Sequence, residues 1–423
     1  MPVSGSILGN PVQRVEDPRI LHGEARYFDD LPVDGLAHVV FVRSTVAHAR
    51  VTGVDTADAE RMPGVLAVYT AANLAVPDVQ GFIMLPPAFS RPALANGIVR
   101  FVGDIVAAVV AETRSQAVDA AEAVVVDYDP LPVVLDPEAA LAEGAPVLFP
   151  DHGTNEAIAF NFGEDDTVLD GADVVVEGRF VNQRIAAVPM EPNGILVQPE
   201  GDGLLVHVPT QAPFGVRDQL APLLGLEPEQ VRVVAPAVGG GFGAKTGCYP
   251  EYVIVGAAAR ALGRPLKWSE TRSENMVAMN QGRGQVQLIK LGVKNDGTIV
   301  GIKGKVFCDA GAYPSMGAFL PFLTRSMSAG VYKIDKIELN TWSAATNTTT
   351  TGAYRGAGRP EATQYLERIL DMAAVELGMD PVEIRRKNFI PPESFPLTTV
   401  TGSNYDVGEY AKALDEACRV AGY

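Results

Sequence analysis

A glycine-rich stretch at residues 235–246, APAVGGGFGAKT, is the feature that most narrows the fold of this chain. It follows a predicted strand at 230–234 and precedes a strongly apolar predicted helix at 249–262. Glycine tolerates positive φ and close backbone contacts, so such a loop places main-chain atoms against a ligand or a neighbouring segment. These residues are compatible with three interpretations: a triphosphate-binding loop, a dinucleotide-binding turn, and a turn that serves packing alone.

Both nucleotide patterns fit the stretch incompletely. A triphosphate loop has glycine before its lysine, but Ala244 precedes Lys245, and no later strand ends in an obvious aspartate for the metal. The dinucleotide pattern GxGxxA fits from Gly239, and Glu270 ends the next predicted strand, where a ribose-binding acid would stand. The interval of 31 residues (270 − 239) exceeds the usual spacing of about 20. A nucleotide-dependent dehydrogenase stays open as an alternative.

The composition predicts a large folded protein and excludes some partners. At 423 residues, 47% of them hydrophobic, the chain suggests two or three domains with sizeable cores. A net charge of −17 repels phosphates, so we expect neither nucleic acid nor an anionic membrane surface as a partner. No apolar run reaches about 18 residues, so no membrane span is expected. The first residues also lack the layout of a signal peptide.

The cysteines and histidines are too scattered along the chain to suggest a metal site. Cys248, Cys308 and Cys418 form no CxxC pair, which argues against a zinc ribbon or an iron–sulfur cluster built from this chain alone. The five histidines form no i, i+4 pair. We therefore expect no metal held by protein ligands, and a reduced, cytoplasmic compartment.

The predicted elements form an α/β unit followed by a longer mixed unit. In the first unit, strands are expected at 36–43, 65–70, 104–111 and 124–127, with a helix at 115–123 capped by Ser115. Five prolines between 130 and 150 predict an interdomain linker at 131–154. In the second unit we expect helices at 213–224, 361–377 and 410–420, a strand at 265–270, and a hairpin of 285–293 with 298–307 around an Asn-Asp-Gly turn. The predicted fold class is α+β.

Six motifs follow one another along the chain. They are GEARYFDD at 23–30 with RSTVAHAR at 43–50, MEP at 190–192, Thr210-Gln211, GGGFGAK at 239–245, AYRGAGR at 353–359 and DPVEIRRKN at 380–388. In this order they resemble the large subunits of the molybdenum hydroxylases, the family of xanthine dehydrogenase, aldehyde oxidase and carbon monoxide dehydrogenase. The resemblance implies an N-terminal extension at 1–18, a hammerhead domain at 19–130, a first molybdopterin-binding domain at 155–395 and the start of a second at 396–423.

The resemblance also implies a cofactor site. Molybdenum would be held through the dithiolene of molybdopterin, so the protein would supply orientation and electrostatics instead of metal ligands. The cofactor would carry a cytosine dinucleotide. The amide of Gln211 would donate to an oxo ligand, Phe242 would close one wall beside the metal, and Arg355 would face the cofactor. The backbone along the pterin would come from Gly240, Gly241 and Gly243.

The implied reaction is a hydroxylation in which water supplies the oxygen atom. Electrons would leave through the pterin to an iron–sulfur subunit with [2Fe–2S] clusters and to a flavin subunit with FAD. Gly356 stands where the members that oxidise carbon monoxide have a copper-binding cysteine, so that activity is not expected. Thr246 and Ala357, at the substrate pocket, replace the glutamate and the aromatic residue of the purine-oxidising members. An aldehyde or another N-heterocycle therefore fits better than xanthine.

The general base of the family belongs to a C-terminal half that this sequence lacks. We therefore expect either a separate chain that supplies that half, or a fragment, and we assign no catalytic base. The carboxylates of Glu191, Glu251 and Glu361 match no base, and Glu191 and Glu361 are expected to be ion-paired or capping groups. A non-catalytic chain that keeps the fold is the remaining alternative.

Overall fold

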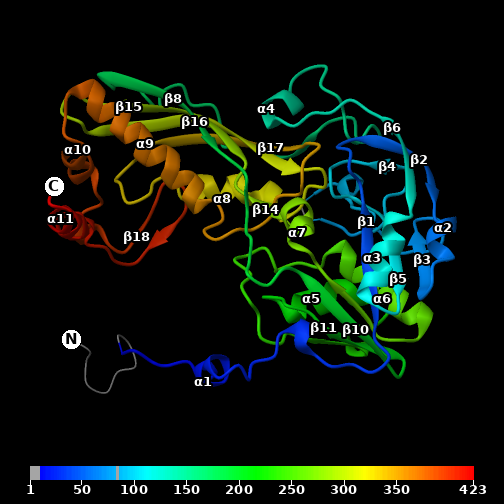
Figure 1. The fold of residues 1–423 in the computed structure, drawn as a ribbon. Coiled ribbons are helices and arrows are strands. Elements are labelled where there is room, and N and C mark those ends of the chain that lie inside the picture. Colours follow the sequence, from blue (N-terminus) through cyan, green and yellow to red (C-terminus); the bar gives the residue numbers. More distant parts are fainter. Residues whose placement is uncertain (1–9, 82–84) are drawn as a thin grey trace.

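Two β-sheets organise the chain into two lobes in the computed structural model, which describes residues 10–81 and 85–423 (Figure 1). The first sheet has seven strands in the order β12 (Val231–Val234), β11 (Gly203–His207), β10 (Gly194–Glu200), β13 (Leu266–Ser269), β1 (Ala37–Arg43), β5 (Ile105–Ala111) and β3 (Val65–Thr70). The second has five, in the order β7 (Glu156–Phe160), β17 (Ile337–Ala345), β16 (Ile299–Gly311), β15 (Gln285–Val293) and β8 (Val174–Asn182). The mixed α and β content agrees with the predicted fold class.

The seven-stranded sheet joins segments that are far apart in the sequence. Strand β1 pairs parallel with β13, with Ala37 opposite Leu266. Strand β5 is buried on both faces, because Val109 packs towards α3 (Arg114–Glu122) while Val110 packs into the core that contains α6 (Pro250–Leu262). This double burial explains the continuous apolar run at 105–111. The sheet therefore crosses the boundary that the sequence places near residue 130.

The helix predicted at 115–123 is present as α3, but its N-cap is Thr113 and not Ser115. The Thr113 hydroxyl accepts a hydrogen bond from the Gln116 N–H at 3.3 Å, and the Gln116 Oε1 accepts one from the Thr113 N–H at 3.1 Å. These reciprocal bonds form a capping box, which satisfies two N–H groups at the start of the helix and so fixes where it begins.

The remaining predicted strands of the first unit are confirmed. Strand β6 (Val125–Pro130) covers the expected 124–127 and pairs with β2 (Ala49–Asp55), which also pairs with β4 (Ile98–Val99). The short helices α1 (Asp17–Leu21) and α2 (Ala57–Glu60) complete this part of the chain. Residues 1–9 of the predicted N-terminal extension lie outside the described residues.

The proline-rich stretch at 131–154, where we expected an interdomain linker, is packed against the core. It contains α4 (Pro137–Ala140), and its Val134, Leu148 and Phe149 side chains belong to a buried cluster with residues of the five-stranded lobe. The Val134 N–H donates to the Asn347 Oδ1 at 3.0 Å. The stretch is ordered because its apolar side chains, spaced between the prolines, find partners in a sheet far along the chain.

The hairpin and the long helix of the second lobe are as the sequence predicts. Strands β15 and β16 pair antiparallel across the Asn-Asp-Gly turn. Helix α9 (Arg359–Leu377) lies across this sheet and ends at Gly378, whose φ is +64°. Its buried side chains, among them Leu366, Ile369 and Ala373, follow helical spacing and face the sheet.

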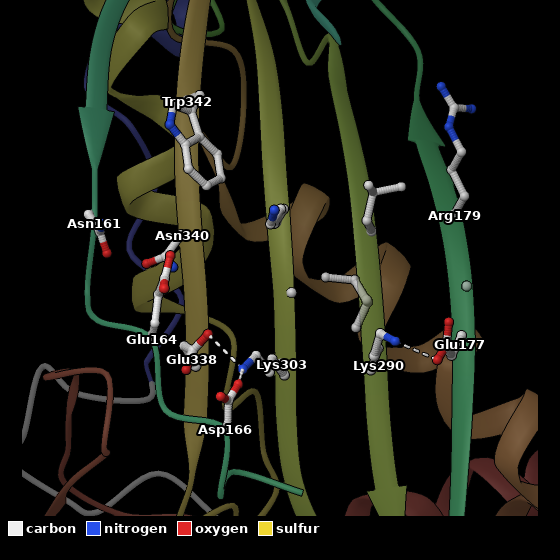
Figure 2. A pocket seen from close by; sticks show the side chains of 15 residues that line it. Asn161, Glu164, Asp166, Glu177, Arg179, Lys290, Lys303, Glu338, Asn340 and Trp342 are labelled. Atoms are coloured by element: carbon white, nitrogen blue, oxygen red, sulfur yellow. Dashed lines mark hydrogen bonds and ion pairs between the residues drawn. The ribbon is translucent and has the colours of Figure 1, made fainter.

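The face of the five-stranded sheet opposite α9 is open and hollowed (Figure 2). The hollow has a volume of about 670 Å³. Across it, Lys290 pairs with Glu177 at 2.6 Å, and Lys303 pairs with Asp166 at 3.0 Å and Glu338 at 3.5 Å. Because these charges pair with one another in a solvated face, the hollow offers little unmatched charge to a ligand.

The remaining helices and strands pack on the two lobes, connect them or form the C-terminal segment. They are β9 (Ile185–Ala186), α5 (Pro213–Leu223), α7 (Arg272–Ala278), β14 (Gln281–Gly282), α8 (Leu320–Ser326), α10 (Pro381–Asn388), β18 (Leu397–Thr398), β19 (Asn404–Tyr405) and α11 (Tyr410–Ala421). The expected helices at 213–224, 249–262 and 410–420 are thus confirmed as α5, α6 and α11. None of the described helices is long and apolar enough to cross a membrane.

Candidate functional site

The glycine loop joins β12 to α6, but these elements are not arranged as in a dinucleotide-binding fold. In that fold the strand after the helix lies beside the strand before it. Here β11 and β10 separate β12 from β13. Glu270, the expected ribose-binding acid, is buried, and its Oε2 accepts hydrogen bonds from the Asn193 N–H and the Asn275 Nδ2, both at 2.7 Å. The dehydrogenase interpretation of this loop is therefore wrong.

The burial of Glu270 predicts how the stability of the fold depends on pH. Burial raises its pKa to about 7, against the opposing hydrogen bonds from Asn275 and Asn193. A carboxyl whose pKa is higher in the folded state stabilises the fold at low pH, and that stabilisation is lost as the pH rises from about 4.5 to 7. We expect Glu270→Gln, which can still accept both bonds, to remove this loss and to be more stable than the original chain by roughly 3 kcal/mol at pH 8.

Urea unfolding of both proteins at several values between pH 5 and 8 measures this difference. Glu143→Gln, at an exposed position, controls for the change in net charge. The same slope of stability against pH for Glu270→Gln and the original chain would contradict the prediction.

The buried side chain of Lys245 anchors the glycine loop to Glu191, so Lys245 is not a phosphate ligand. Its side chain is completely buried, and Nζ donates to the Glu191 carbonyl oxygen at 2.8 Å and pairs with the Glu191 Oε2 at 3.1 Å. The same Oε2 accepts from the Gly239 N–H at 2.8 Å. Burial lowers the pKa of Lys245, and Glu191 opposes that shift. The expectation that Glu191 is an ion-paired group is confirmed, and the triphosphate interpretation of Lys245 is wrong.

Phe242 is held in a backbone conformation that is uncommon for a bulky residue. Its φ is +55°, which costs a non-glycine residue about 1–2 kcal/mol. Its carbonyl oxygen accepts a hydrogen bond from the Arg355 N–H at 2.9 Å, and the Arg355 guanidinium carbon lies 4.6 Å from the centre of its ring. The two expected site residues, 113 positions apart (355 − 242), therefore meet through both backbone and side chain.

Gln211 lies against the same loop. Its Oε1 accepts from the Gly243 N–H at 2.8 Å, and its own N–H donates to the Lys245 carbonyl oxygen at 2.8 Å. Because the amide oxygen is occupied by an N–H donor, the Nε2 is the end that can donate to a ligand. The Gln211 side chain is exposed, as is that of Arg355.

The glycines of the loop are needed for its contacts with the rest of the protein. A Cβ at Gly241 would overlap the Gln211 amide, and one at Gly243, whose φ is +97°, would lie 2.9 Å from the Ala353 carbonyl oxygen. Gly240 also has a positive φ, of +99°. The loop can therefore hold Gln211, Phe242 and the segment at 353–359 close together only because these side chains are absent.

Arg283 supports the second loop, and no motif in the sequence marks it as a functional residue. Its Nη2 donates to the Arg355 carbonyl oxygen at 2.7 Å and its Nη1 to the Tyr354 carbonyl oxygen at 3.3 Å. Nη1 also pairs with the Glu361 Oε1 at 3.4 Å, which confirms that Glu361 is ion-paired, though not with Arg359. The only local signal is that Arg283, with a φ of +67°, stands between two glycines.

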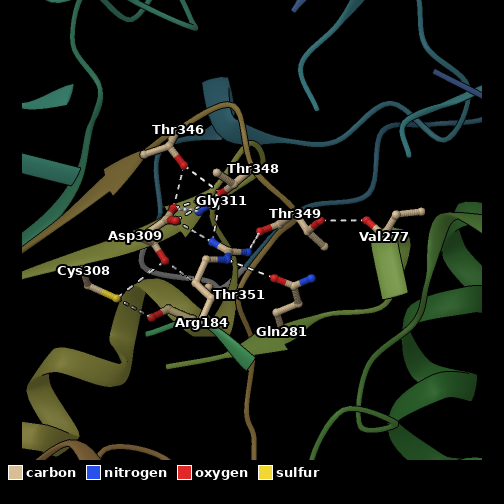
Figure 3. Close-up of polar contacts among 11 residues, drawn as sticks. Arg184, Val277, Gln281, Cys308, Asp309, Gly311, Thr346, Thr348, Thr349 and Thr351 are labelled. Carbon is tan, nitrogen blue, oxygen red and sulfur yellow. Dashed lines mark hydrogen bonds and ion pairs between the residues drawn. The ribbon is translucent and has the colours of Figure 1, made fainter. Parts of the chain in front are cut away.

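Arg184 fixes the segment that leads into this loop (Figure 3). Its Nη1 pairs with the Asp309 Oδ2 at 2.6 Å, its Nε donates to the Gln281 Oε1 at 3.0 Å, and its Nη2 donates to the Thr349 carbonyl oxygen. The Gln281 carbonyl oxygen in turn accepts from the Gly352 N–H at 2.8 Å. One cation thus ties the connection to the loop at 353–359 to β16 of the five-stranded sheet and to β14.

A hollow of about 380 Å³ opens beside the glycine loop, which is large enough for a small organic ligand. Thr246 and Gly247 line it, together with Asn280 and Thr350 from the second lobe. The Thr246 hydroxyl donates to the Gly243 carbonyl oxygen at 2.9 Å. Ala357, the other expected substrate-pocket residue, is not among the residues that line the hollow. It lies in the turn after Arg355 with a φ of +39°.

The remaining carboxylates and possible ligands add no base or metal centre to this site. Glu251 is buried and pairs with Arg43 at 2.9 Å. All three cysteines are free. Within residues 10–81 and 85–423, no group of three or more histidine, cysteine, aspartate or glutamate side chains could hold a metal ion.

The site as a whole consists of two interlocked loops that present an amide, an aromatic ring and a guanidinium on an exposed face. A neutral N–H donor, a cation and a backbone free of side chains suit an anionic, oxygen-rich cofactor that carries its own metal ligands. The donor set therefore fits molybdopterin better than a metal ion bound directly by protein.

Comparisons with known proteins agree with this fit. The family model described as "Molybdopterin cofactor-binding domain" matches residues 148–389, and "Aldehyde oxidase and xanthine dehydrogenase, a/b hammerhead domain" matches residues 22–132. The large subunit of nicotine 6-hydroxylase from Paenarthrobacter nicotinovorans is 36% identical over 426 residues, which cover 98% of this chain and 52% of that protein.

Solved structures give the same picture. Quinoline 2-oxidoreductase from Pseudomonas putida 86 has a TM-score of 0.91 and 35% identity, covering 98% of this chain and 54% of the other. Aldehyde oxidoreductase from Desulfovibrio gigas has a TM-score of 0.90 and 31% identity, covering 100% of this chain and 47% of the other. The chain spans about half the length of the relatives it matches.

Proposed function

Because the chain belongs to the molybdenum hydroxylase large-subunit family, we propose that it forms the molybdopterin-binding part of an enzyme that hydroxylates an aldehyde or an N-heterocycle. Water supplies the oxygen atom in this reaction. The observation that carries the proposal is the meeting of Gln211, Phe242 and Arg355 on two loops that are locked together.

The residues of the two loops have separate tasks in this proposal. The cofactor, when bound, supplies the redox chemistry and passes the electrons on. Gln211 would donate its Nε2 N–H to the metal end of the cofactor, Phe242 would exclude water from one wall of the site, and Arg355 would offer positive charge and the backbone around it. The loop from Gly240 to Gly243 runs along the pterin. These groups orient the cofactor before the substrate arrives, so little reorganisation is needed during the reaction.

The other side of the site has to come from outside these residues. Gln211, Thr246 and Arg355 are exposed here, and the chain spans about half of its relatives, so we propose that a further polypeptide segment or a separate chain covers this face and brings the general base. We also propose the cytosine dinucleotide form of the cofactor, an iron–sulfur subunit with [2Fe–2S] clusters, a flavin subunit with FAD, and a cytoplasmic location. The domain boundaries near 130, 154 and 395 remain part of this proposal.

The proposal predicts that Gln211→Ala and Phe242→Ala, made together in the complex with all its partners, lower turnover by about 100-fold or more. One positioned donor alone is worth about that much. Turnover of aldehyde and N-heterocycle probes and the molybdenum content of the purified complex are measured together. Gln183→Ala, which removes another exposed glutamine, is the control and keeps full turnover.

Two outcomes would count against the proposal. Unchanged turnover with molybdenum still bound would show that the site residues are wrongly assigned. A complex purified with all partners that carries no molybdenum and oxidises no probe would favour the alternative of a non-catalytic chain that keeps the fold.

A further inference from the structure

The hollow beside the glycine loop contains a charged group that no motif predicts. Arg91 lines it on the side formed by the N-terminal unit, where the backbone of Arg91 pairs with that of Val79. The guanidinium carbon lies 5.1 Å from the centre of the Phe101 ring and 5.5 Å from that of Tyr313. Only 9% of the Arg91 side chain is exposed. A buried cation beside two aromatic rings needs acceptors for its N–H groups.

Arg91 lacks those acceptors. Within the described parts of the chain, its Nε and Nη2 have no hydrogen-bond partner. The nearest carboxylate oxygen is the Asp104 Oδ1, 3.8 Å from Nη2, which is within reach of an ion pair but too far for a hydrogen bond. The other oxygen of Asp104 accepts from the Tyr313 hydroxyl at 2.9 Å and from the Arg100 N–H at 3.1 Å. Asp104 therefore compensates part of the charge and leaves two donors unused.

The rest of the lining is uncharged but rich in hydrogen-bonding groups. Arg91 is the only charged residue among the described residues that line the hollow, in a chain whose net charge is −17. The polar side chains around it include Gln80, Gln219, Asn280 and Ser315. A cation that is only partly compensated by Asp104, in a lining that is otherwise uncharged, favours a small anion that can accept its free N–H groups.

We propose that this hollow binds the carboxylate of a small substrate and that Arg91 recognises it. Nε and Nη2 form one edge of the guanidinium, and a carboxylate can accept a hydrogen bond from each of them. Both atoms are covered by protein in the present conformation, so the guanidinium turns towards the hollow when the carboxylate enters. Thr246 and Gly247 then place the rest of the substrate beside the glycine loop. The inference rests on the proposed function and narrows its substrates to carboxylate-bearing aldehydes and N-heterocycles.

Equilibrium binding tests this inference without turnover. We expect benzoate to bind the full chain about 10- to 100-fold more tightly than benzamide, the range for hydrogen bonds to a charged group. Arg91→Gln removes this preference and leaves benzamide binding unchanged. Titration calorimetry measures both affinities, and thermal unfolding checks that the variant is folded. Equal binding of the two probes, or no benzoate binding, by the original chain would overturn the inference, as would undiminished benzoate binding by folded Arg91→Gln.

A second variant covers the case in which Arg91→Gln does not fold. Gln219 is exposed on α5, and its Oε1 accepts from the Cys248 N–H at 3.3 Å, a bond that glutamate can also accept. Gln219→Glu adds negative charge to the hollow, so it weakens benzoate binding and spares benzamide binding. Asn295→Asp makes the same charge change at an exposed hairpin turn and alters neither. If Gln219→Glu binds benzoate as the original chain does, Arg91 is not the carboxylate site.

The kinetics of the complex loaded with cofactor distinguish a failure of this inference from a failure of the proposed function. With pyridine-3-carboxylate and pyridine-3-carboxamide as probes, we expect Arg91→Gln to raise KM for the carboxylate about 10- to 100-fold and KM for the amide much less, because the amide carbonyl is an uncharged acceptor. A complex that holds molybdenum and oxidises both probes equally well keeps the proposed function and refutes the carboxylate site. A complex without molybdenum whose chain still prefers benzoate refutes the proposed function alone.

Discussion

Replacing Arg283 by methionine is expected to lower the free energy of unfolding by about 3–5 kcal/mol, because it leaves a carboxylate buried without its cation. The Glu361 side chain is completely buried, and its Oε1 pairs with the Arg283 Nη1 at 3.4 Å. Its Oε2 has no hydrogen-bond partner within the described residues, so no second donor there shares the charge. Methionine fills a similar volume, so the loss comes from the charge rather than from a cavity.

The same substitution is expected to reduce activity. Arg283 donates to the carbonyl oxygens of Tyr354 and Arg355, so the variant frees the loop that carries Arg355. Urea unfolding measures the stability of Arg283→Met, and the double variant with Glu361→Gln is the matched control. Since glutamine is uncharged, the double variant should recover part of the lost stability but none of the lost turnover. A loss below about 1 kcal/mol for the single variant would show that the buried pair is not needed.

Gly243→Ala is expected to lower turnover of the loaded complex by about 100-fold, since it separates the two loops. The new Cβ would lie 2.9 Å from the Ala353 carbonyl oxygen and 3.1 Å from the Ala353 carbonyl carbon. Backbone atoms cannot swing away as a flexible side chain does, so the segment at 353–359 has to move. A displacement of about 1 Å is enough to cost a reaction that much when the displaced group orients a cofactor or substrate.

Gly163→Ala is the control that distinguishes the effect of this contact from the effect of backbone strain alone. Gly163 has a φ of +108°, close to the +97° of Gly243, but no atom lies within 4 Å of its added Cβ. Both variants carry the strain of about 1–2 kcal/mol that a positive φ imposes on alanine. We expect Gly243→Ala to unfold at a lower urea concentration than Gly163→Ala, and only Gly243→Ala to lose turnover. Equal stability and equal turnover of the two variants would show that the approach of Ala353 is unimportant.

The elements with strong local signals were predicted from the sequence. The apolar run at 105–111 specifies β5, the Asn-Asp-Gly turn specifies the β15–β16 hairpin, and the amphipathic repeat that ends at Gly378 specifies α9, each within a few residues. Their signals are local because a strand or helix repeats its pattern within a few residues. The cap of α3 was misplaced by two residues, since Thr113 and Ser115 are both acceptable caps and only the contact with Gln116 distinguishes them.

The packing of the stretch at 131–154 and the arrangement of the strands could not be predicted in this way. Proline interrupts helices and strands, but its presence does not indicate whether nearby apolar side chains pack against residues that are distant in the sequence. The order of the strands likewise depends on long-range pairing, such as that of β1 with β13 across more than 200 residues. That order excludes a dinucleotide-binding fold, which the loop sequence alone left open.

By itself, the sequence determined the fold class and the family resemblance, and it selected Gln211, Phe242 and Arg355 as candidate site residues, because ordered motifs such as GGGFGAK and AYRGAGR carry this information locally. Only the tertiary structure decided which groups hold these residues together and which of them are exposed. Lys245 meets Glu191 across 54 residues, Arg283 meets Glu361 across 78, and Arg184 meets Asp309 across 125. The unpartnered donors of Arg91 are visible only in the folded protein, because whether a charge is buried and compensated depends on neighbours that are distant in the sequence.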